Sequence, residues 1–331
     1  MEFMLAEWIG KPVWMWLGFL AIVGALLAFD LGVLNRTDKE MGIRDSLVLS
    51  AFYIGFAMFF GGLIWWGYDA GIITTEDGQH AGLTYFTGFF IEKALSIDNV
   101  FVISLIFGYF AIPRAYQYRA LVWGIIAVIV LRGIMIAVGA ALVQEHGWVL
   151  YLFGAFLIAT GIKMLAVKES ETDVSRNPIV RFMTKRMRVT PTLHGQKFLV
   201  RLPDPVTGRM VVWATPLLLA LVIINLADLV FAVDSVPAIF AITTDTFVVY
   251  TANIMAILGL RALYFALAAM VHRFEYLKYA LAMVLVFIGL KIFWNGLVGK
   301  LNPGISLGVT VALIAGGILY SLYRTRDHKL A

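Results

Sequence analysis

The sequence predicts an all-α polytopic membrane protein with about nine transmembrane helices and a 3+3 inverted repeat. Hydrophobic residues make up 61% of the 331 residues and charged residues 14%, whereas an ordinary globular domain is roughly 45 to 50% apolar. The apolar residues also fall in stretches of about 20 or more, the length that a helix needs to cross a bilayer. A third observation is that polar residues recur in the same order inside two groups of these stretches.

The expected spans follow one another with mostly short connections. They cover residues 13–34, 46–67, 83–112, 119–143, 148–166, 214–243, 247–271, 278–298 and 305–323. Neither a basic segment nor a small-residue cleavage site accompanies the first span, so we expect no removable signal peptide. Residues 203–208, with two prolines and a glycine, predict a turn at the tip of a short hairpin.

The distribution of basic residues predicts the orientation. Most of the 26 Lys and Arg residues lie in alternate loops and in the C-terminal tail, whereas the opposite side has only Lys11 and Lys300. By the positive-inside rule, the N-terminus faces out and the C-terminus faces the cytoplasm, in the cytoplasmic (inner) membrane. The formal charge of +5 is then a consequence of topology. We therefore expect the lipid bilayer, and not nucleic acid, as the partner.

The one long connection, residues 167–213, contains a basic run at residues 181–188. Such a run can form an amphipathic helix on anionic lipid or a docking site for a partner protein. The plainer interpretation is a solvated loop on the positive side of the membrane. Both interpretations stay open, as does assembly into a homo-oligomer.

Polar pairs inside the spans indicate an internal repeat. Leu131-Arg132 recurs as Leu260-Arg261, and Gly161-Ile-Lys163 recurs as Gly289-Leu-Lys291, each time after a span that holds two acids. Each unit is three spans long, so the second must cross the membrane in the opposite direction, as in many secondary transporters. The expected units are a two-span hairpin at 1–80, repeat one at 81–166, the basic loop at 167–213, repeat two at 214–298, and a last span with its tail at 299–331.

Two pairs of acids, each spaced by six residues, lie in apolar surroundings: Glu92 with Asp98, and Asp228 with Asp234. A charged side chain near the bilayer centre costs roughly 2.5 to 3.5 kcal/mol, so such residues usually belong to an ion or substrate path. Six residues leave two side chains about 120° apart on a helix. We therefore expect either local unwinding between the acids, aided by Pro237, or pairing of acids across the two repeats.

The residue types around these acids favour a hard divalent cation such as Mn²⁺, Ca²⁺ or Mg²⁺. The chain has no cysteine, and its five histidines fall in loops or near span ends, which argues against thiolate or imidazole metal sites. The candidate ligands carry carboxylate, amide or hydroxyl oxygens. They are Glu92, Asp98, Asn99, Asn225, Asp228, Asp234 and Ser235.

The alternative is that the acids only neutralise buried bases. Five acids face five bases inside the spans, so a fully paired structural network is conceivable. Arg132 and Arg261 lie deepest, and each is expected to pair with a carboxylate or with carbonyl groups at a helix end. The residues given a gating or charge-pairing role are Asp30, Arg132, Arg261, Lys163 and Lys291.

Several long motifs resemble the TerC family of integral membrane proteins, and most of all its Alx-type branch. They are EKALSIDNVF at 92–101, ATP at 214–216, FAVDSVPA at 231–238 and AILGLRA at 256–262. The resemblance implies a place in the wider LysE-like transporter group, and roles in manganese export, metal homeostasis, alkaline-pH response and, in some members, tellurite resistance. It also implies function for Glu92, Asp98, Asn99, Asp228 and Asp234, and matches Asp30 to an Asp in the family's first span.

One position departs from the family pattern: Asn225 stands where a Glu-Leu-x-Asp sequence would be expected. The missing negative charge puts the coordination of an ion, and proton coupling through this position, in doubt.

The expected function is that of a Mn²⁺ exporter working by alternating access, with protons as a natural counter-ion. No nucleotide-binding motif and no cofactor motif are evident, so we expect neither an enzyme nor a prosthetic group. Rival functions are a membrane scaffold or stress protein without transport, and a membrane redox modulator.

Overall fold

The computed structural model describes residues 7–8, 10–33, 42–73, 78–166, 188–204, 208–267, 276–299 and 301–325. It confirms an all-α polytopic fold. The helices are α2 (Val13–Val33), α3 (Ile43–Asp69), α4 (Gly78–Tyr109), α5 (Arg114–Glu145), α6 (Val149–Ala166), α8 (Pro216–Phe240), α9 (Thr246–Leu258), α10 (Leu260–Leu267), α11 (Leu277–Leu297) and α12 (Pro303–Arg324).

Eight helical stretches in the described part are long and apolar enough to cross a membrane, with α9 and α10 counted together as Thr246–Leu267. The ninth expected span corresponds to α4, which is not among the eight. This helix has 32 residues, so it is about 48 Å long at 1.5 Å per residue. It carries Glu92, Lys93 and Asp98, whose charges lower its apolar character.

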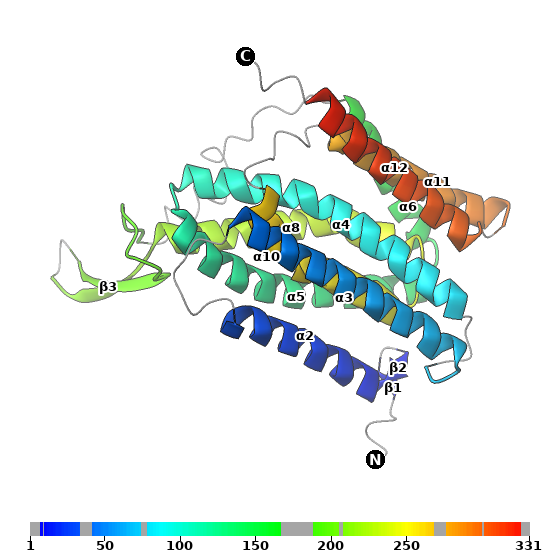
Figure 1. Ribbon diagram of the computed structural model, residues 1–331, viewed down its shortest axis with the longest axis horizontal. Coiled ribbons are helices and arrows are strands. Elements are labelled where there is room, and N and C mark those ends of the chain that lie inside the picture. Colours follow the sequence, from blue (N-terminus) through cyan, green and yellow to red (C-terminus); the bar gives the residue numbers. More distant parts are fainter. Residues whose placement is uncertain are drawn as a thin grey trace.

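The helices form one elongated bundle (Figure 1), with α4 crossing its middle, α2 on one side, and α6, α11 and α12 on the other. Helix α4 packs against α3, α8 and α9, while α5 packs against α8. Every residue of α9 is buried. Because α9 has no lipid-facing side, it is the helix around which the others are arranged.

The two acid-bearing helices are continuous, so of the two alternatives, unwinding between the acids is wrong and pairing across the repeats is left. Helix α4 runs unbroken through Glu92 and Asp98, and α8 runs through Pro237, which lies inside it. The interruption is instead at Gly259, between α9 and α10. Close packing favours glycine there: an added Cβ at Gly259 would lie 3.0 Å from Tyr53 Cβ and 3.1 Å from Lys93 Nζ.

Helices α6 and α11 approach each other closely through small residues. An added Cβ at Gly154 would lie 3.2 Å from the Gly289 carbonyl oxygen, and one at Gly161 would lie 2.7 Å from the Ala282 carbonyl oxygen. Backbone therefore touches backbone, a packing that only small residues permit in membrane helices.

Two short antiparallel hairpins complete the described structure. Strands β3 (Leu199–Pro203) and β4 (Met210–Ala214) pair with Leu199 opposite Ala214, which confirms the predicted hairpin, while residues 205–207 of the predicted turn lie outside the described residues. This hairpin projects beyond one end of the helices in Figure 1. Of the basic run at 181–188, residues 181–187 lie outside the described residues. Strands β1 (Glu7–Trp8) and β2 (Lys11–Pro12) form a hairpin that the sequence did not predict.

Candidate functional site

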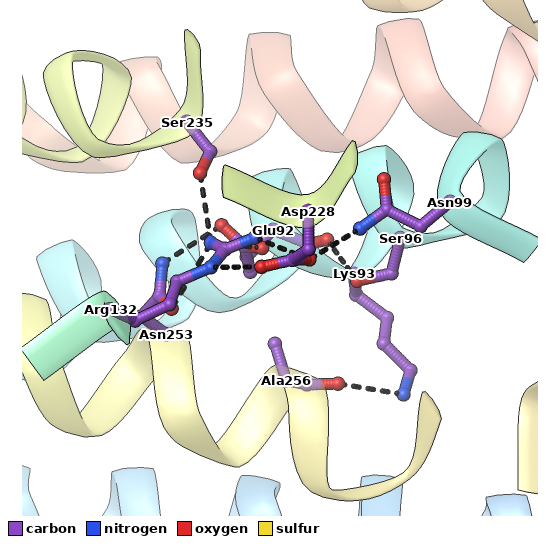
Figure 2. Close-up of polar contacts among 9 residues, drawn as sticks. All are labelled: Glu92, Lys93, Ser96, Asn99, Arg132, Asp228, Ser235, Asn253 and Ala256. Carbon is purple, nitrogen blue, oxygen red and sulfur yellow. Dashed lines mark hydrogen bonds and ion pairs between the residues drawn. The ribbon is translucent and has the colours of Figure 1, made fainter. Parts of the chain in front are cut away.

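A buried polar cluster lies where α4, α5, α8 and α9 meet, and Arg132 of α5 is at its centre (Figure 2). Arg132 Nη1 donates to Glu92 Oε1 at 2.6 Å, to Ser235 Oγ at 2.9 Å and to Asn253 Oδ1 at 3.2 Å. Its Nε and Nη2 donate to the two oxygens of Asp228, each at 3.2 Å. Arg132 is only 1% exposed. The guanidinium thus joins two carboxylates from different helices.

Two asparagines extend this cluster. Asn253 Nδ2 donates to Glu92 Oε2 at 2.9 Å, so Asn253 binds both members of the Glu92–Arg132 pair. Asn99 Nδ2 donates to Asp228 Oδ1 at 3.1 Å, whereas Asn99 Oδ1 is buried without a partner. A cavity of about 20 Å³ lies beside Asn99 and Asp228 and is otherwise lined by apolar residues and Gly124. It has room for about one water-sized sphere.

Helix periodicity explains why these side chains face one another. Residues seven apart lie within about 20° of each other after two turns. Glu92 and Asn99 on α4 have this spacing, and so do Asp228 and Ser235 on α8. The spacing of seven in both helices, and not the spacing of six between the acids, is therefore the sequence signal for the shared face.

Lys93 lies next to the cluster but turns to α9. Its Nζ donates to the Ala256 carbonyl oxygen at 3.1 Å, close to the interruption at Gly259. This bond satisfies a carbonyl near the end of α9, where helical partners run out. Adjacent residues of α4 thus hold α9 at two points, Glu92 through Asn253 and Lys93 through Ala256 (Figure 2).

A second buried ion pair joins Arg261 of α10 to Asp30 of α2. Tyr118 donates to the Asp30 carbonyl oxygen at 3.3 Å, and its ring lies 4.5 Å from the Arg261 guanidinium carbon. Arg261 Nε and Nη1 are buried without a partner. Both deep arginines therefore pair with carboxylates, as expected, but Arg261 has far fewer acceptors than Arg132.

The remaining candidate residues lie apart from the cluster. Asn225 Nδ2 donates to the Leu221 carbonyl oxygen of its own helix at 2.8 Å, and its Oδ1 is buried without a partner. Lys291 is buried and donates to Ser306 Oγ at 3.1 Å, while Lys163 is exposed.

The side chains of Asp98 and Asp234 lie outside the described residues. Among the side chains that the structure does describe, no three His, Asp or Glu gather closely enough to hold a metal ion. The site formed by all four acids thus stays a prediction. Its first two members, Glu92 and Asp228, meet through Arg132. Asn253 was missed by the sequence analysis, and its only signal was a lone amide inside an apolar span.

Fold and cluster together define an integral, multi-pass membrane protein with a buried carboxylate–guanidinium centre. The chain belongs to the TerC family of integral membrane proteins, whose model matches residues 77–329.

Relatives cover nearly the whole chain. An "Uncharacterized membrane protein" of Rickettsia felis is 44% identical over 315 residues, which are 95% of this chain and 99% of the relative. A "Putative membrane-bound redox modulator Alx" of Escherichia coli K12 is 42% identical over 287 residues, 86% of each chain. The protein of the same name from Photorhabdus laumondii is 38% identical over 320 residues, 95% of this chain and 96% of the relative. No solved structure matches the chain significantly.

Proposed function

We propose that the protein is a secondary transporter that exports a divalent cation, with Mn²⁺ as the favoured substrate, across the cytoplasmic membrane. One observation carries the proposal: Glu92 and Asp228, from two different apolar helices, converge in the interior of the bundle. Ionisable residues inside membrane spans generally belong to ion paths. Asn99, Ser235 and Asn253 add amide and hydroxyl oxygens, the ligand types that hard divalent ions prefer.

The packing supports an inverted repeat in which α4, α5 and α6 correspond to α8, α9–α10 and α11. Helix α4 packs on α9, and α8 packs on α5, so the two contacts exchange when the units are exchanged. The α6–α11 crossing behaves in the same way. Gly154 meets Gly289, and Gly161 meets Ala282. Gly161 is the equivalent of Gly289, and Gly154 is the equivalent of Ala282, so the first contact becomes the second when the units are exchanged. Such symmetry with a midplane polar site is typical of alternating access.

Transport can be tested with purified protein in liposomes that contain a Mn²⁺-sensitive dye. Wild type should move Mn²⁺, with a rate that depends on a pH gradient if protons are exchanged. Glu92→Gln and Asp228→Asn should each slow transport by more than about tenfold, which corresponds to about 1.4 kcal/mol of activation free energy. Asp30→Asn is the matched control, because it also unpairs a buried arginine but outside the cluster. Equal losses in all three variants would contradict ion binding at the cluster.

A second candidate is a membrane scaffold or stress-response protein without transport. Its supporting observation is the charge pairing itself, because Arg132 already engages Glu92 and Asp228, and Arg261 engages Asp30. A redox modulator, as some relatives are named, would need a redox group other than thiols, since the chain has no cysteine.

Cellular metal content separates the two candidates. If cells with Glu92→Gln or Asp228→Asn lower their manganese as wild type does, transport at this site is excluded. If deletion of residues 175–200 alone abolishes the phenotype, the scaffold function is favoured.

A further inference from the structure

We infer that Arg132 acts as a tethered cation: its guanidinium occupies the oxygens of the ion site, and only a divalent ion can displace it. This inference rests on the proposed function and assigns to Arg132 the discrimination between divalent and monovalent ions.

The first argument is the shape of the guanidinium environment. Five oxygens from four side chains surround its nitrogens at 2.6 to 3.2 Å: one each from Glu92, Ser235 and Asn253, and two from Asp228. Two carboxylates, an amide and a hydroxyl are also the donor set of a hard cation. The cluster is thus assembled around a positive charge, and that charge is at present supplied by the protein itself.

The second argument is an acceptor that the guanidinium leaves unused. Asn99 is 5% exposed and donates to Asp228 through Nδ2, and none of the described residues donates to its Oδ1. A buried, unsatisfied acceptor is costly and calls for a partner. The water-sized cavity beside Asn99 and Asp228 gives a water or an ion room to enter at the edge of the site.

Charge explains why a divalent ion is needed. With Glu92 and Asp228 ionised, the three charged residues sum to −1 while Arg132 is in place. A monovalent ion that replaced Arg132 would restore the same charge, and it would lose the multiple hydrogen bonds of the guanidinium. A divalent ion has twice the Coulomb attraction to each carboxylate and neutralises both. Arg132 therefore excludes K⁺ and Na⁺ by competition.

Arg261 offers a matched comparison within the same chain. It is equally buried, at 1% exposed, and occupies the equivalent position in the second Leu-Arg pair. Within the described structure it contacts one carboxylate, that of Asp30, and its Nε and Nη1 have no hydrogen-bond partner. Removing this arginine unpairs a buried acid without opening a multi-oxygen site.

The test is thermal unfolding of the purified full-length protein in detergent, titrated with MnCl₂ or KCl. A ligand that binds only the folded state stabilises it by RT ln(1 + L/Kd), where L is the free ligand concentration, so at a given concentration a tighter-binding ligand raises Tm more. Arg132→Gln should have a lower Tm than wild type without Mn²⁺, and Mn²⁺ should restore it. The Mn²⁺ concentration that gives half of the maximal rise in Tm should be lower for Arg132→Gln than for wild type by about tenfold or more, equivalent to about 1.4 kcal/mol of binding free energy. KCl should stabilise Arg132→Gln but not wild type.

Control variants make the outcome decisive. Arg261→Gln should lose stability without gaining Mn²⁺ binding, and Arg132→Gln with Glu92→Gln should lose the Mn²⁺ effect. If Arg132→Gln does not fold, Arg132→Lys provides the test, because it keeps the charge but has fewer donors and should bind Mn²⁺ more tightly than wild type.

Unchanged or weaker Mn²⁺ binding in a folded Arg132 variant overturns the inference, and so does an equal gain in Arg261→Gln. If wild type moves Mn²⁺ in liposomes while these results appear, the inference fails alone. If wild type moves no divalent ion, the proposed function fails, and with it the selectivity role of Arg132.

Discussion

Arg132 and Arg261 occupy equivalent positions in the two expected repeats, yet their surroundings differ. Arg132 binds two carboxylates and two neutral oxygens, whereas in the described part of the chain Arg261 pairs with one carboxylate, that of Asp30. A buried charge needs a partner because desolvation costs several kcal/mol per ion. Asp30 provides the counter-charge of Arg261, while Arg132 has more acceptors than charge pairing requires, as we expect if the proposed ion binding takes place there.

Asn253 is the residue through which α9 joins this centre, so its removal should be felt there. Asn253→Ala would leave Glu92 Oε2 and Arg132 Nη1 each without one hydrogen bond. We expect a stability loss of about 1 to 2 kcal/mol together with slower transport. Asn225→Ala is the control, because the one hydrogen bond described for the Asn225 side chain goes to its own helix backbone. Thermal unfolding in detergent and liposome transport measure both effects, and equal results for the two variants would contradict a role of Asn253 in the cluster.

At the scale of elements, α4 and α9 are connected by side chains at the interruption between α9 and α10. Gly259→Ala would place a Cβ 3.0 Å from Tyr53 Cβ and 3.1 Å from Lys93 Nζ. The Lys93 amine would have to move away from the Ala256 carbonyl, so we expect a loss of about 1 kcal/mol, at the lower end of overpacking costs. Gly308→Ala, with no atom within 4 Å of the added Cβ, is the control. A Tm equal to wild type in Gly259→Ala would show that the interruption tolerates a side chain.

The α6–α11 crossing should be more sensitive, because there the obstacle is backbone. An added Cβ at Gly289 would lie 2.7 Å from the Gly154 carbonyl oxygen. Gly289→Ala must therefore push the helices apart, at about 1 to 3 kcal/mol. Gly24→Ala in α2 meets no atom within 4 Å, and should be neutral or slightly stabilising since alanine favours helix. The Tm difference between these two variants measures the effect, and its absence would contradict the close crossing.

For the whole molecule, the direction of the proposed transport depends on the orientation of the chain in the membrane. The natural chain has no cysteine, so single cysteines can be labelled without background. His146→Cys, after α5, should react with a membrane-impermeant maleimide in intact cells. Arg209→Cys, in the β3–β4 hairpin, should react only after permeabilisation, because the positive-inside rule assigns that end to the cytoplasm. The reverse pattern would invert the proposed orientation, and with it the direction of export.

Much of the architecture was predictable because apolarity and length are local properties of a segment. Eight of the nine expected spans have the required length and composition. The exception, α4, has the charges that give the protein its candidate site. The β3–β4 hairpin was predictable for a similar reason, since proline and glycine between two strands mark a change of chain direction locally.

The composition of the site was also partly predictable, because acids rarely persist in apolar helices without a role. Glu92 and Asp228 were expected to approach each other across the bundle, and in the structure both bind Arg132. What could not be deduced was the group that joins them. Arg132 lies 40 residues from Glu92 and 96 from Asp228 along the chain, and nothing local specifies which arginine reaches which acid.

The sequence by itself determined the membrane class, the spans and the presence of buried acids and arginines, because these follow from composition and helix length. Only the tertiary structure decided which faces turn inward. In it, Arg132 binds both Glu92 and Asp228, and Arg261 pairs with Asp30. Helices α4 and α8 are continuous, and the interruption lies at Gly259. The physical reason is that partners for buried charges, and the space available to each side chain, are set by close packing between helices that are distant in the chain.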